Sequence, residues 1–373
     1  MNPKVSIIIP AYKDNELLPD LLDKLLKNDY AEKEIIVIFD EPTPESLKAI
    51  SKYNNHIRLI INKERKGKVY ALNIGGKLAT GDLLLFFDND VTINRCDFLR
   101  RVVEEMEGYD IGEILKVIIR DRSLISRMVF YDYLASMYGN YLFYKFLGRC
   151  VGFNGAAVVM TKQTFRDLNG FRCVTAEDLD FGIRTFIKNK RFKFIKSIRV
   201  YNTSPSSIKE WYKQRRRWAL GAGFWIKEYG KDLLSITKQN AKIILPVLLT
   251  LFPSFIPLAL VFLLNNSYIE NILFLLLLTI SSRINFLIPV TVFTSYYLSF
   301  IKTLISTLTS MVIFSIYFYY ISRKINVIFS PVEFMIYYLF YSPVWLIILL
   351  TGILKAFISK RIMLDDWKLP DCP

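Results

Sequence analysis

The sequence predicts an α/β domain with a mostly parallel sheet, followed by a C-terminal bundle of about four transmembrane helices. Two observations predict this arrangement. In the N-terminal part of the chain, short apolar segments rich in β-branched residues alternate with segments that carry apolar residues at helical spacing. Beyond Lys242 the chain consists mainly of long apolar runs, and the whole chain is 52% hydrophobic with a mean hydropathy of +0.28.

Four strands are expected in the N-terminal part, with a helix between the first two. Short, fully apolar strands are typical of a parallel sheet that helices cover on both faces. In such a sheet the ligand binds beyond the carboxyl ends of the strands, so the polar residues that follow each strand are candidates for a binding site. The strands are expected at Val5–Ile9, Glu34–Phe39, Ile57–Ile61 and Leu83–Phe87, and the helix at Asn15–Leu26.

The fourth strand runs directly into Asp88-Asn89-Asp90. Two carboxylates at a strand end make a hard oxygen site for Mg²⁺ or Mn²⁺, whose remaining positions diphosphate oxygens can fill. A metal ion there would stabilise the charge on a departing nucleoside diphosphate. Acidic turns after strands are common, so the weight of this pattern depends on the motifs around it.

The C-terminal part of the chain contains candidate membrane spans. Ile243–Leu264, Thr303–Ile321 and Val332–Leu354 are each long enough to cross a bilayer, which takes about 20 residues. Ile269–Phe300, which polar residues interrupt, is one tilted span or two short ones, so four or five spans are expected. No signal peptide is expected before them. The residues that precede the spans are therefore expected in the cytoplasm, and the protein in the cell membrane.

Positive charge is concentrated just before the first expected span. The net charge is +15, and the stretch from Arg184 to Arg217 holds twelve basic residues against one acidic residue, Glu210. A basic block beside a membrane anchor predicts contact with anionic lipid headgroups or with a phosphorylated substrate. Nucleic-acid binding is the rival explanation for a basic protein, and the adjoining anchor argues against it.

Six motifs follow one another in order along the part of the chain before the spans. They are Ser6-Ile7-Ile8-Ile9-Pro10-Ala11-Tyr12, Asp40-Glu41, Gly67-Lys68-x-x-Ala71-Leu72-Asn73, Gly81-Asp82 with Asp88-x-Asp90, Ala176-Glu177-Asp178, and Gln214-x-x-Arg217-Trp218. The series resembles the family 2 glycosyltransferases, whose catalytic domain has the GT-A fold, a Rossmann-like nucleotide-sugar-binding domain. The last motif is shared with cellulose, chitin and hyaluronan synthases and with ceramide glucosyltransferases, which indicates a membrane subgroup. The second strand of the family often ends in Asp-Asp-Gly-Ser, whereas this chain has Asp40-Glu41-Pro42-Thr43, so the nucleotide is not identified.

The resemblance implies a role for each matching residue. Asp178 matches the general base, with Glu177 beside it, although acidic residues there also suit a helix N-terminus. Asp88 and Asp90 match the carboxylates that bind Mg²⁺ or Mn²⁺. The acceptor region corresponds, more loosely, to Asn154, Gly155 and Ala156. The implied donor-binding residues are Pro10, Tyr12, Asp40, Glu41, Lys68, Asn73, Asp88, Asn89, Gln214, Arg217 and Trp218.

These observations divide the chain into four parts. Residues 1–206 are expected to form a cytoplasmic GT-A catalytic domain, and 207–240 interfacial amphipathic helices that carry the Gln214–Trp218 motif. Residues 241–356 are the expected transmembrane region, and 357–373 a C-terminal tail. Within the first part, the aromatic-rich segment 123–147 is either an interfacial helix or a core helix.

The expected function is that of an inverting glycosyltransferase that uses a UDP- or GDP-sugar. The favoured acceptor is a membrane lipid or a lipid-linked glycan, because the chain has few spans and none before the catalytic domain. The alternative is a processive polysaccharide synthase that couples polymer extension to export, which the Gln214–Trp218 motif favours. A non-catalytic, membrane-anchored protein that binds nucleotide sugars is a more remote hypothesis. The oligomeric state is not predicted.

Overall fold

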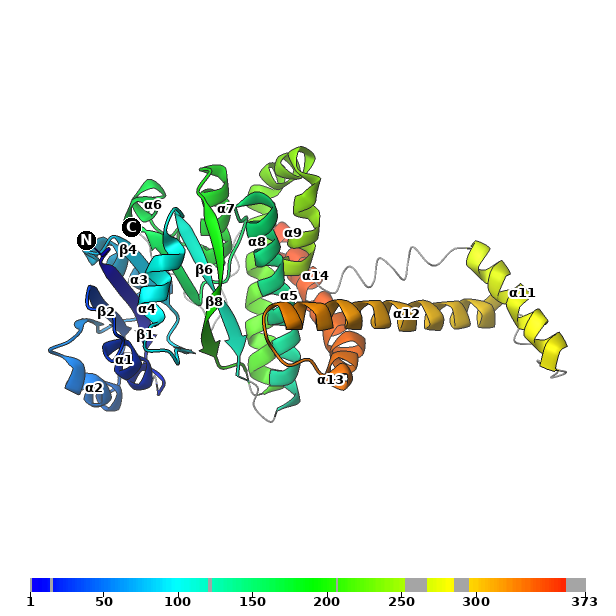
Figure 1. Cartoon of the computed structure of the whole chain (residues 1–373), viewed down its shortest axis with the longest axis horizontal. Coiled ribbons are helices and arrows are strands. Elements are labelled where there is room, and N and C mark those ends of the chain that lie inside the picture. Colours follow the sequence, from blue (N-terminus) through cyan, green and yellow to red (C-terminus); the bar gives the residue numbers. More distant parts are fainter. Residues whose placement is uncertain are drawn as a thin grey trace. The chain divides into compact units, whose positions relative to one another are not determined.

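The structure is a computed structural model that describes residues 2–13, 16–119, 123–205, 207–251, 267–284 and 295–359. The chain divides into two compact units, Met1–Leu251 with Ile347–Pro373, and Phe252–Leu346. The first unit contains a sheet with helices around it, and the described part of the second contains helices (Figure 1).

One eight-stranded sheet forms the centre of the first unit, in the order β3-β2-β1-β4-β7-β6-β8-β5 (Figure 1). The strands β3, β2, β1 and β4 run parallel to one another, whereas β7 is antiparallel to both β4 and β6. Strand β8 pairs parallel with β6 and antiparallel with β5. The four expected strands are confirmed, and the sheet becomes mixed beyond β4. The bounds are β1 Val5–Tyr12, β2 Lys33–Asp40, β3 Arg58–Asn62, β4 Leu83–Phe87, β5 Val91–Thr92, β6 Ile111–Ile118, β7 Ala157–Thr161 and β8 Phe192–Asn202.

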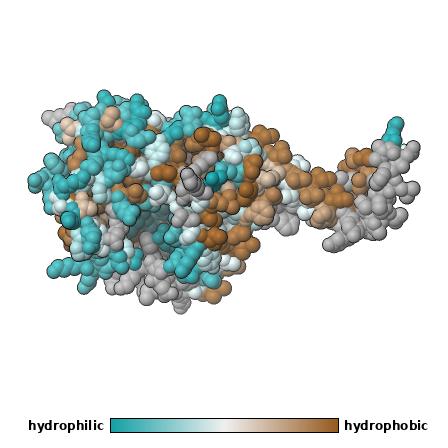
Figure 2. Space-filling view, turned by 90° about the horizontal axis from the view of Figure 1, so that it is seen from below, coloured by the Kyte–Doolittle hydropathy of each residue, from teal (hydrophilic) through white to brown (hydrophobic). Residues whose placement is uncertain are grey.

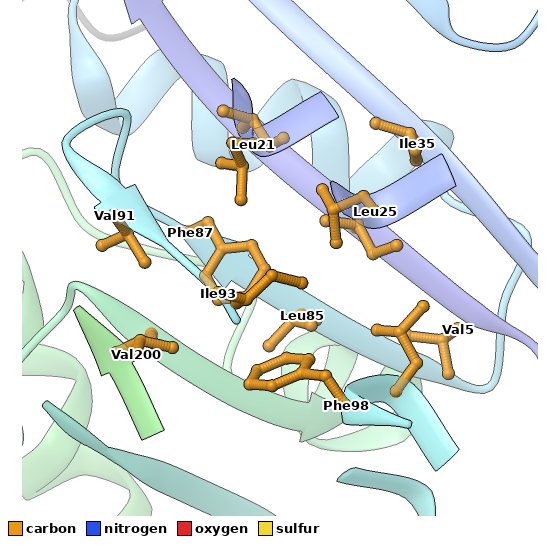
Figure 3. Packing of buried hydrophobic residues seen from close by; sticks show 14 of the residues in the cluster. Val5, Leu21, Leu25, Ile35, Leu85, Phe87, Val91, Ile93, Phe98 and Val200 are labelled. Atoms are coloured by element: carbon orange, nitrogen blue, oxygen red, sulfur yellow. The ribbon is translucent and has the colours of Figure 1, made fainter. Parts of the chain in front are cut away.

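Alternate residues of the strands bury the two faces of the sheet. One face packs against α1 (Leu18–Leu26) and α4 (Phe98–Met106) in a single hydrophobic core. Figure 3 shows this core, with Leu21 and Leu25 of α1 and Phe98 of α4 close to the strand residue Phe87. The other face lies against α3 (Lys68–Leu78), where a Cβ added at Gly75 would stand 2.4 Å from Ile8 Cγ2. Coverage of both faces explains why the strands are apolar throughout.

The short helices of the first unit connect or flank the strands. They are α2 (Pro44–Ile50), α6 (Lys162–Asp167), α7 (Glu177–Ile187) and α9 (Ile244–Leu251), with 3₁₀ turns at Ser51–Tyr53 and Ala241–Ile243. Helix α1 begins three residues later than expected, at Leu18 rather than Asn15, with a proline in its first turn. Proline is favoured there because its missing N–H would have no helical partner.

The aromatic-rich segment folds as α5 (Leu124–Leu147), and fifteen of its 24 residues are buried. Ser123 caps its N-terminus by accepting the N–H of Ser126. The helix contacts β6, β8 and α9 within the first unit. Its aromatic side chains therefore meet protein, which favours the core-helix alternative over the interfacial one.

Residues 207–240 form one continuous helix, α8 (Ile208–Gln239), instead of the several helices expected. Ser207 caps it, and Trp211, Leu220, Trp225 and Tyr229 are among its buried residues. The helix packs closely on the end of α14 (Ser342–Ile358), where a Cβ added at Gly352 would stand 2.4 Å from Ala219 Cβ. Side-chain packing on two sides thus keeps this long helix in place.

The basic block 184–217 is not a single exposed surface. At least five of its twelve basic side chains form ion pairs with carboxylates from elsewhere in the sequence or the same helix. One of them, Arg215, is 0% exposed. The positive surface that remains for a membrane or a substrate is accordingly smaller than the sequence indicates. The paired residues are Arg184 with Asp180, Lys190 with Asp167, Arg191 with Asp110, Lys193 with Glu105, and Arg215 with Asp132.

The second unit contains α11 (Ser267–Ile284), α12 (Ser295–Lys324), α13 (Pro331–Ile336) and a π-helical turn at Tyr337–Tyr341 that leads into α14. Among the described residues, two helical stretches are long and apolar enough to cross a membrane, Phe300–Lys324 and Pro331–Ile358. Hydrophobic residues cover much of their visible surface (Figure 2). A shorter apolar helix covers Phe274–Arg283.

Two of the expected spans, Thr303–Ile321 and Val332–Leu354, fall within these two stretches. The expected spans 243–264 and 269–300 include residues 252–266 and 285–294, which lie outside the described residues. A bundle of four or five spans therefore stays a prediction.

Candidate active site

The carboxyl ends of β1, β2 and β4 meet at one edge of the sheet. Tyr12 of β1 stands in register with Asp40 of β2, and β1 also pairs in parallel with β4, which Asp88 follows. Parallel pairing brings the residues after the strands to the same edge, as the sequence predicted. The helix dipole of α3, which starts at this edge with Lys68, also points its positive end here.

Lys68 joins two of the acidic motifs. Its Nζ lies 2.6 Å from Asp88 Oδ1 and 3.0 Å from Glu177 Oε1, although these residues come from α3, the end of β4 and the start of α7. Burial lowers the pKa of Lys68, but the charges of Asp88 and Glu177 outweigh this and hold it above its ordinary value. The lysine is therefore a fixed cation at the centre of the candidate site.

Asp178 lies beside this cation at the N-terminus of α7. Its Oδ1 accepts the N–H of Leu179 at 2.8 Å, and its Oδ2 accepts the N–H of Gly155 at 3.2 Å. Burial, with the charge of Glu177, raises its pKa to about 6, while Lys68 and the two backbone N–H groups act in the opposite direction. A carboxylate with such a pKa is charged at neutral pH and still has appreciable affinity for a proton.

Gly155 brings the turn 154–156 against Asp178. A Cβ added at this position would stand 3.3 Å from Asp178 Cβ and 3.6 Å from Lys68 Nζ. Ala156 continues the motif, and its carbonyl accepts the N–H of Asp88 at 2.9 Å. The turn 154–156 is thus placed between Asp88 and Asp178.

Asp90 lies behind Asp88, with half-buried Asn89 between them. Its Oδ1 accepts Asn202 Nδ2 at 3.1 Å, and burial together with the charge of Asp88 raises its pKa. In the part of the chain that the structure describes, no group of three or more His, Cys, Asp or Glu side chains is arranged to hold a metal ion. A metal ion at Asp88 and Asp90 would therefore depend on additional oxygens from a ligand.

Asp40, the last residue of β2, has a structural role. Asp40 is 4% exposed, and its Oδ2 accepts the N–H groups of Lys66 at 3.0 Å and Gly67 at 2.7 Å. Its Oδ1 accepts Asn62 Nδ2 at 2.8 Å. The carboxylate thereby shapes the loop that enters α3, where Gly67 has a φ of 90° that favours glycine. Contact of Asp40 with a donor stays a prediction.

The remaining expected donor residues at this edge differ in their surroundings. Pro10 lies within β1, and the Tyr12 ring has the Arg65 guanidinium 4.3 Å from its centroid. Glu41 has a φ of 45°, and its N–H is donated to Asn62 O. Asn73 lies apart from them, because its side-chain amide exchanges two hydrogen bonds of 2.8 Å with the backbone of Phe171. Asn73 therefore holds a loop, and its contact with a donor stays a prediction.

Residues 6–166 match the family model described as Glycosyl transferase family 2. The match covers less than half of the chain, and this N-terminal part is similar to that family.

Two relatives are named as sugar transferases. The chain is 25% identical over 255 residues to the probable glycosyltransferase YdaM of Bacillus subtilis (strain 168), and the match covers 64% of this chain and 60% of that protein. It is 32% identical over 115 residues to the undecaprenyl-phosphate 4-deoxy-4-formamido-L-arabinose transferase of Proteus mirabilis (strain HI4320), covering 29% of this chain and 35% of that protein. The matched part is thus no more than 60% of the length of either relative.

A solved structure shows the same fold. The mannosyltransferase PcManGT from Pyrobaculum calidifontis, in complex with GDP-Man and Mn²⁺, is similar with a TM-score of 0.52 and 17% identity, over 83% of this chain and 88% of that chain. The mixed sheet with its helices is accordingly a GT-A domain. The fold of the chain and the family match of residues 6–166 thus agree.

The Gln214–Trp218 motif lies on α8. Trp218 packs edge to face on Tyr133 of α5, with ring centroids 5.7 Å apart. Gln214, Arg217 and Trp218 are half-buried. The motif also contains Arg215, which the sequence did not indicate as a functional residue. Its guanidinium lies 2.7 Å from Asp132 Oδ2 of α5 and 4.3 Å from the Trp218 ring centroid. This buried ion pair fastens the motif to α5.

Two buried residues of β6 were also missed. Glu113 accepts the N–H of Asn154 at 3.0 Å and Asn140 Nδ2 at 2.8 Å, and Lys116 Nζ donates to Asn154 Oδ1 at 3.1 Å. Lys116 also lies 4.3 Å from the centroid of the Tyr133 ring. Their only signal in the sequence is a pair of charged residues inside an apolar strand, Ile111–Ile118.

Proposed function

We propose that this protein is an inverting, metal-dependent glycosyltransferase of the cell membrane with its catalytic domain in the cytoplasm. It moves a sugar from a UDP- or GDP-sugar to a hydroxyl group of a membrane lipid or a lipid-linked glycan. The observation that carries the proposal is the meeting of Lys68, Asp88, Glu177 and Asp178, which come from three distant segments of the chain.

Asp178 is the general base. Two backbone N–H groups hold its carboxylate, and its pKa of about 6 suits a group that must be ionised at neutral pH and then accept a proton. It takes the proton of the acceptor hydroxyl while that oxygen attacks the anomeric carbon of the donor. The bond from that carbon to the diphosphate oxygen breaks in the same displacement, so the anomeric configuration inverts. Glu177 orients Lys68 and raises the proton affinity of Asp178.

The donor lies over the edge of the sheet. Lys68 offers its charge to the donor diphosphate, since its present partners Asp88 and Glu177 hold its Nζ at this edge. The Tyr12 ring, which the Arg65 guanidinium covers, supplies a flat surface for the nucleoside base of the donor. Beside it lies the loop before α3, which Asp40 shapes and which Glu41 adjoins. Arg217, with Gln214 and Trp218, closes over the diphosphate and stabilises its charge as it leaves.

The chemistry of Asp88 and Asp90 fits a divalent metal ion. Burial and the charge of Asp88 raise the pKa of Asp90, so a cation between them would relieve a repulsion. Magnesium in enzymes is commonly held by one or two carboxylates plus substrate phosphates, which fits a pair without a third protein ligand among the described residues. When bound, Mg²⁺ or Mn²⁺ supplies positive charge for the leaving diphosphate.

Membrane association supports a lipid acceptor. Two helical stretches of the chain have the length and composition of spans, and the Proteus relative is named for transfer to undecaprenyl phosphate. Exposed basic residues of 184–217, such as Lys196 and Lys209, are available to anionic headgroups. A processive polysaccharide synthase is the second candidate, favoured by the Gln214–Trp218 motif on a helix that packs closely against the end of α14.

The test uses the full chain in lipid nanodiscs with Mg²⁺ or Mn²⁺ and a panel of UDP- and GDP-sugars. Release of nucleoside diphosphate is measured with and without a native lipid extract, beside Asp178→Asn and Asp88→Ala. We expect metal-dependent release from one donor, a requirement for the lipid extract, and loss of release in both variants.

Other outcomes separate the alternatives. Release without added lipid, together with a lengthening product, would establish a processive synthase instead. Absence of turnover and of binding for every donor would contradict the catalytic proposal and favour a binding protein.

A further inference from the structure

Lys116 is a buried ammonium group that lacks a carboxylate at contact distance. It is 7% exposed, and its Nζ contacts the neutral Asn154 Oδ1 at 3.1 Å and the Tyr133 ring. Among the described residues, no carboxylate oxygen lies within the 4.0 Å of an ion pair. Lys68, in contrast, contacts two carboxylates.

The surrounding acids compensate the charge of Lys116 poorly. Burial raises the pKa of Glu113 to about 8, so this neighbour is mostly uncharged at neutral pH. Asp90 attracts Lys116 from beyond ion-pair distance, and the proposed function engages Asp90 with the metal ion of the donor. A buried cation without a close counter-charge is unfavourable unless an anion or another function offsets it.

Lys116 contacts the turn 154–156, which the family resemblance links to the acceptor. Its partner Asn154 is followed by Gly155, whose N–H donates to Asp178 Oδ2 at 3.2 Å. Lys116 and Asp178 therefore contact adjacent residues of one turn. The donor side is served by Lys68, which contacts Asp88.

We propose that Lys116 binds a phosphate group of the acceptor, next to the hydroxyl group that Asp178 deprotonates. This assignment rests on the proposed function and narrows the acceptor to a phosphate-bearing molecule. Lysine binds phosphate as a point charge, and Asn154 and the Tyr133 face hold its Nζ in one position. The acceptor is the source of the phosphate, because the diphosphate of the donor is engaged by Lys68 and the Asp88–Asp90 edge.

The test measures inorganic phosphate binding by calorimetry to the full chain in nanodiscs of neutral phosphatidylcholine. The protein is first saturated with Mg²⁺ and the nucleoside diphosphate that it binds, so that the donor site is filled. Lys116→Met retains an unbranched side chain and removes the charge, and Lys116→Arg retains the charge. Lys33→Met is the matched control, because Lys33 is a half-buried lysine of β2 whose Nζ donates to the backbone carbonyls of Leu26 and Asn28.

We expect the saturated wild-type protein to bind phosphate and Lys116→Met to bind it about tenfold or more weakly, the effect of losing one charge-assisted contact. Lys116→Arg and Lys33→Met should bind phosphate as the wild type does, and all variants should bind the nucleoside diphosphate alike. Thermal unfolding of each variant confirms that it is folded.

Three results would overturn the assignment. The first is that the wild type does not bind phosphate, and the second is that Lys116→Met binds phosphate as tightly as the wild type. The third is that phosphate competes with the nucleoside diphosphate and Lys116→Met lowers the affinity for that nucleotide, which would make Lys116 a donor-binding residue. A wild type that binds phosphate but no nucleoside diphosphate would overturn the proposed function, and with it the assignment of this phosphate to an acceptor.

Discussion

Helix α7 holds two aspartates, two positions apart, in opposite surroundings. Asp178 faces the 154–156 turn and Lys68, and its carboxylate accepts two backbone N–H groups. Asp180 faces away, is 2% exposed, and accepts hydrogen bonds from Arg172 at 3.1 Å, Arg184 at 2.8 Å and Tyr229 at 2.7 Å. The pKa of Asp178 is raised, whereas the carboxylate of Asp180 accepts three hydrogen bonds from side chains.

The fold thus separates the proposed base, Asp178, from Asp180, which anchors the helix. Trp225 Nε1 of α8 donates to Leu179 O at 3.0 Å, between the two aspartates, so α8 holds the same turn that presents Asp178. Arg184 also binds the carbonyls of Leu168 and Gly170 and fixes the preceding loop. A precisely held base needs such a supporting shell, because small displacements of a catalytic group lower the rate.

The largest effect is expected from neutralising the reactive side. Asp178→Asn should lower kcat/KM by a factor of about 10² to 10⁴, the usual contribution of a general base. Burial penalises the charged form of Asp178, so the variant should unfold at the same or a higher temperature than the wild type. Donor turnover and thermal unfolding of the full chain check both statements. A variant with normal turnover would remove Asp178 from the mechanism.

Breaking the anchoring side should act on stability. Asp180→Ala leaves Arg184 without a carboxylate, whereas Arg172 keeps its ion pair with Glu228, and we expect a loss of about 3 kcal/mol in the free energy of unfolding. The measurement is denaturant unfolding of the full chain in detergent. Asp180→Asn, which keeps acceptor capacity, is the milder control. Unchanged stability together with lost activity would show that Asp180 acts in the reaction instead.

The pH dependence of the rate sharpens the comparison further. The pKa of Asp178 is raised to about 6, so the base is protonated below this pH and ionised above it. The value of kcat/KM should therefore fall about tenfold for each pH unit below 6 and level off above it. A profile between pH 4.5 and 8 with saturating metal checks this. A plateau that extends down to pH 4.5 would contradict the raised pKa.

The smallest effect is expected where a single neutral donor is removed from the anchored side. Tyr229→Phe deletes the hydroxyl that donates to Asp180 and leaves both arginines in place. We expect a loss of about 1 kcal/mol of stability and nearly unchanged kcat/KM. Trp225→Phe, which removes the bond to Leu179 O, is a parallel variant on the same face of α8. A large loss of activity in Tyr229→Phe would mean that the two sides of α7 are not separable.

Local patterns in the sequence predicted the parallel part of the fold and its acidic edge. The strands around Ile7, Ile36 and Leu85 were recognisable because burial on both faces demands continuous apolar runs, and Asp88 follows such a run directly. The aromatic content of α5 did not distinguish lipid from protein as its environment, since the same side chains suit both. The basic block likewise concealed its carboxylate partners, such as Asp110 for Arg191 and Asp132 for Arg215, which lie far away in the chain.

By itself, the sequence determined the α/β start of the chain, the order of the motifs and the residue types available for chemistry, because these depend on short-range periodicity and spacing. Tertiary structure alone decided which of those residues meet. Lys68 contacts both Asp88 and Glu177, and Asp40 binds the backbone of the loop before α3. Asp178 accepts backbone N–H groups, whereas Asp180 accepts hydrogen bonds from side chains. Contacts between distant segments also set the burial and the charges around each carboxylate, and these determine whether it reacts or anchors.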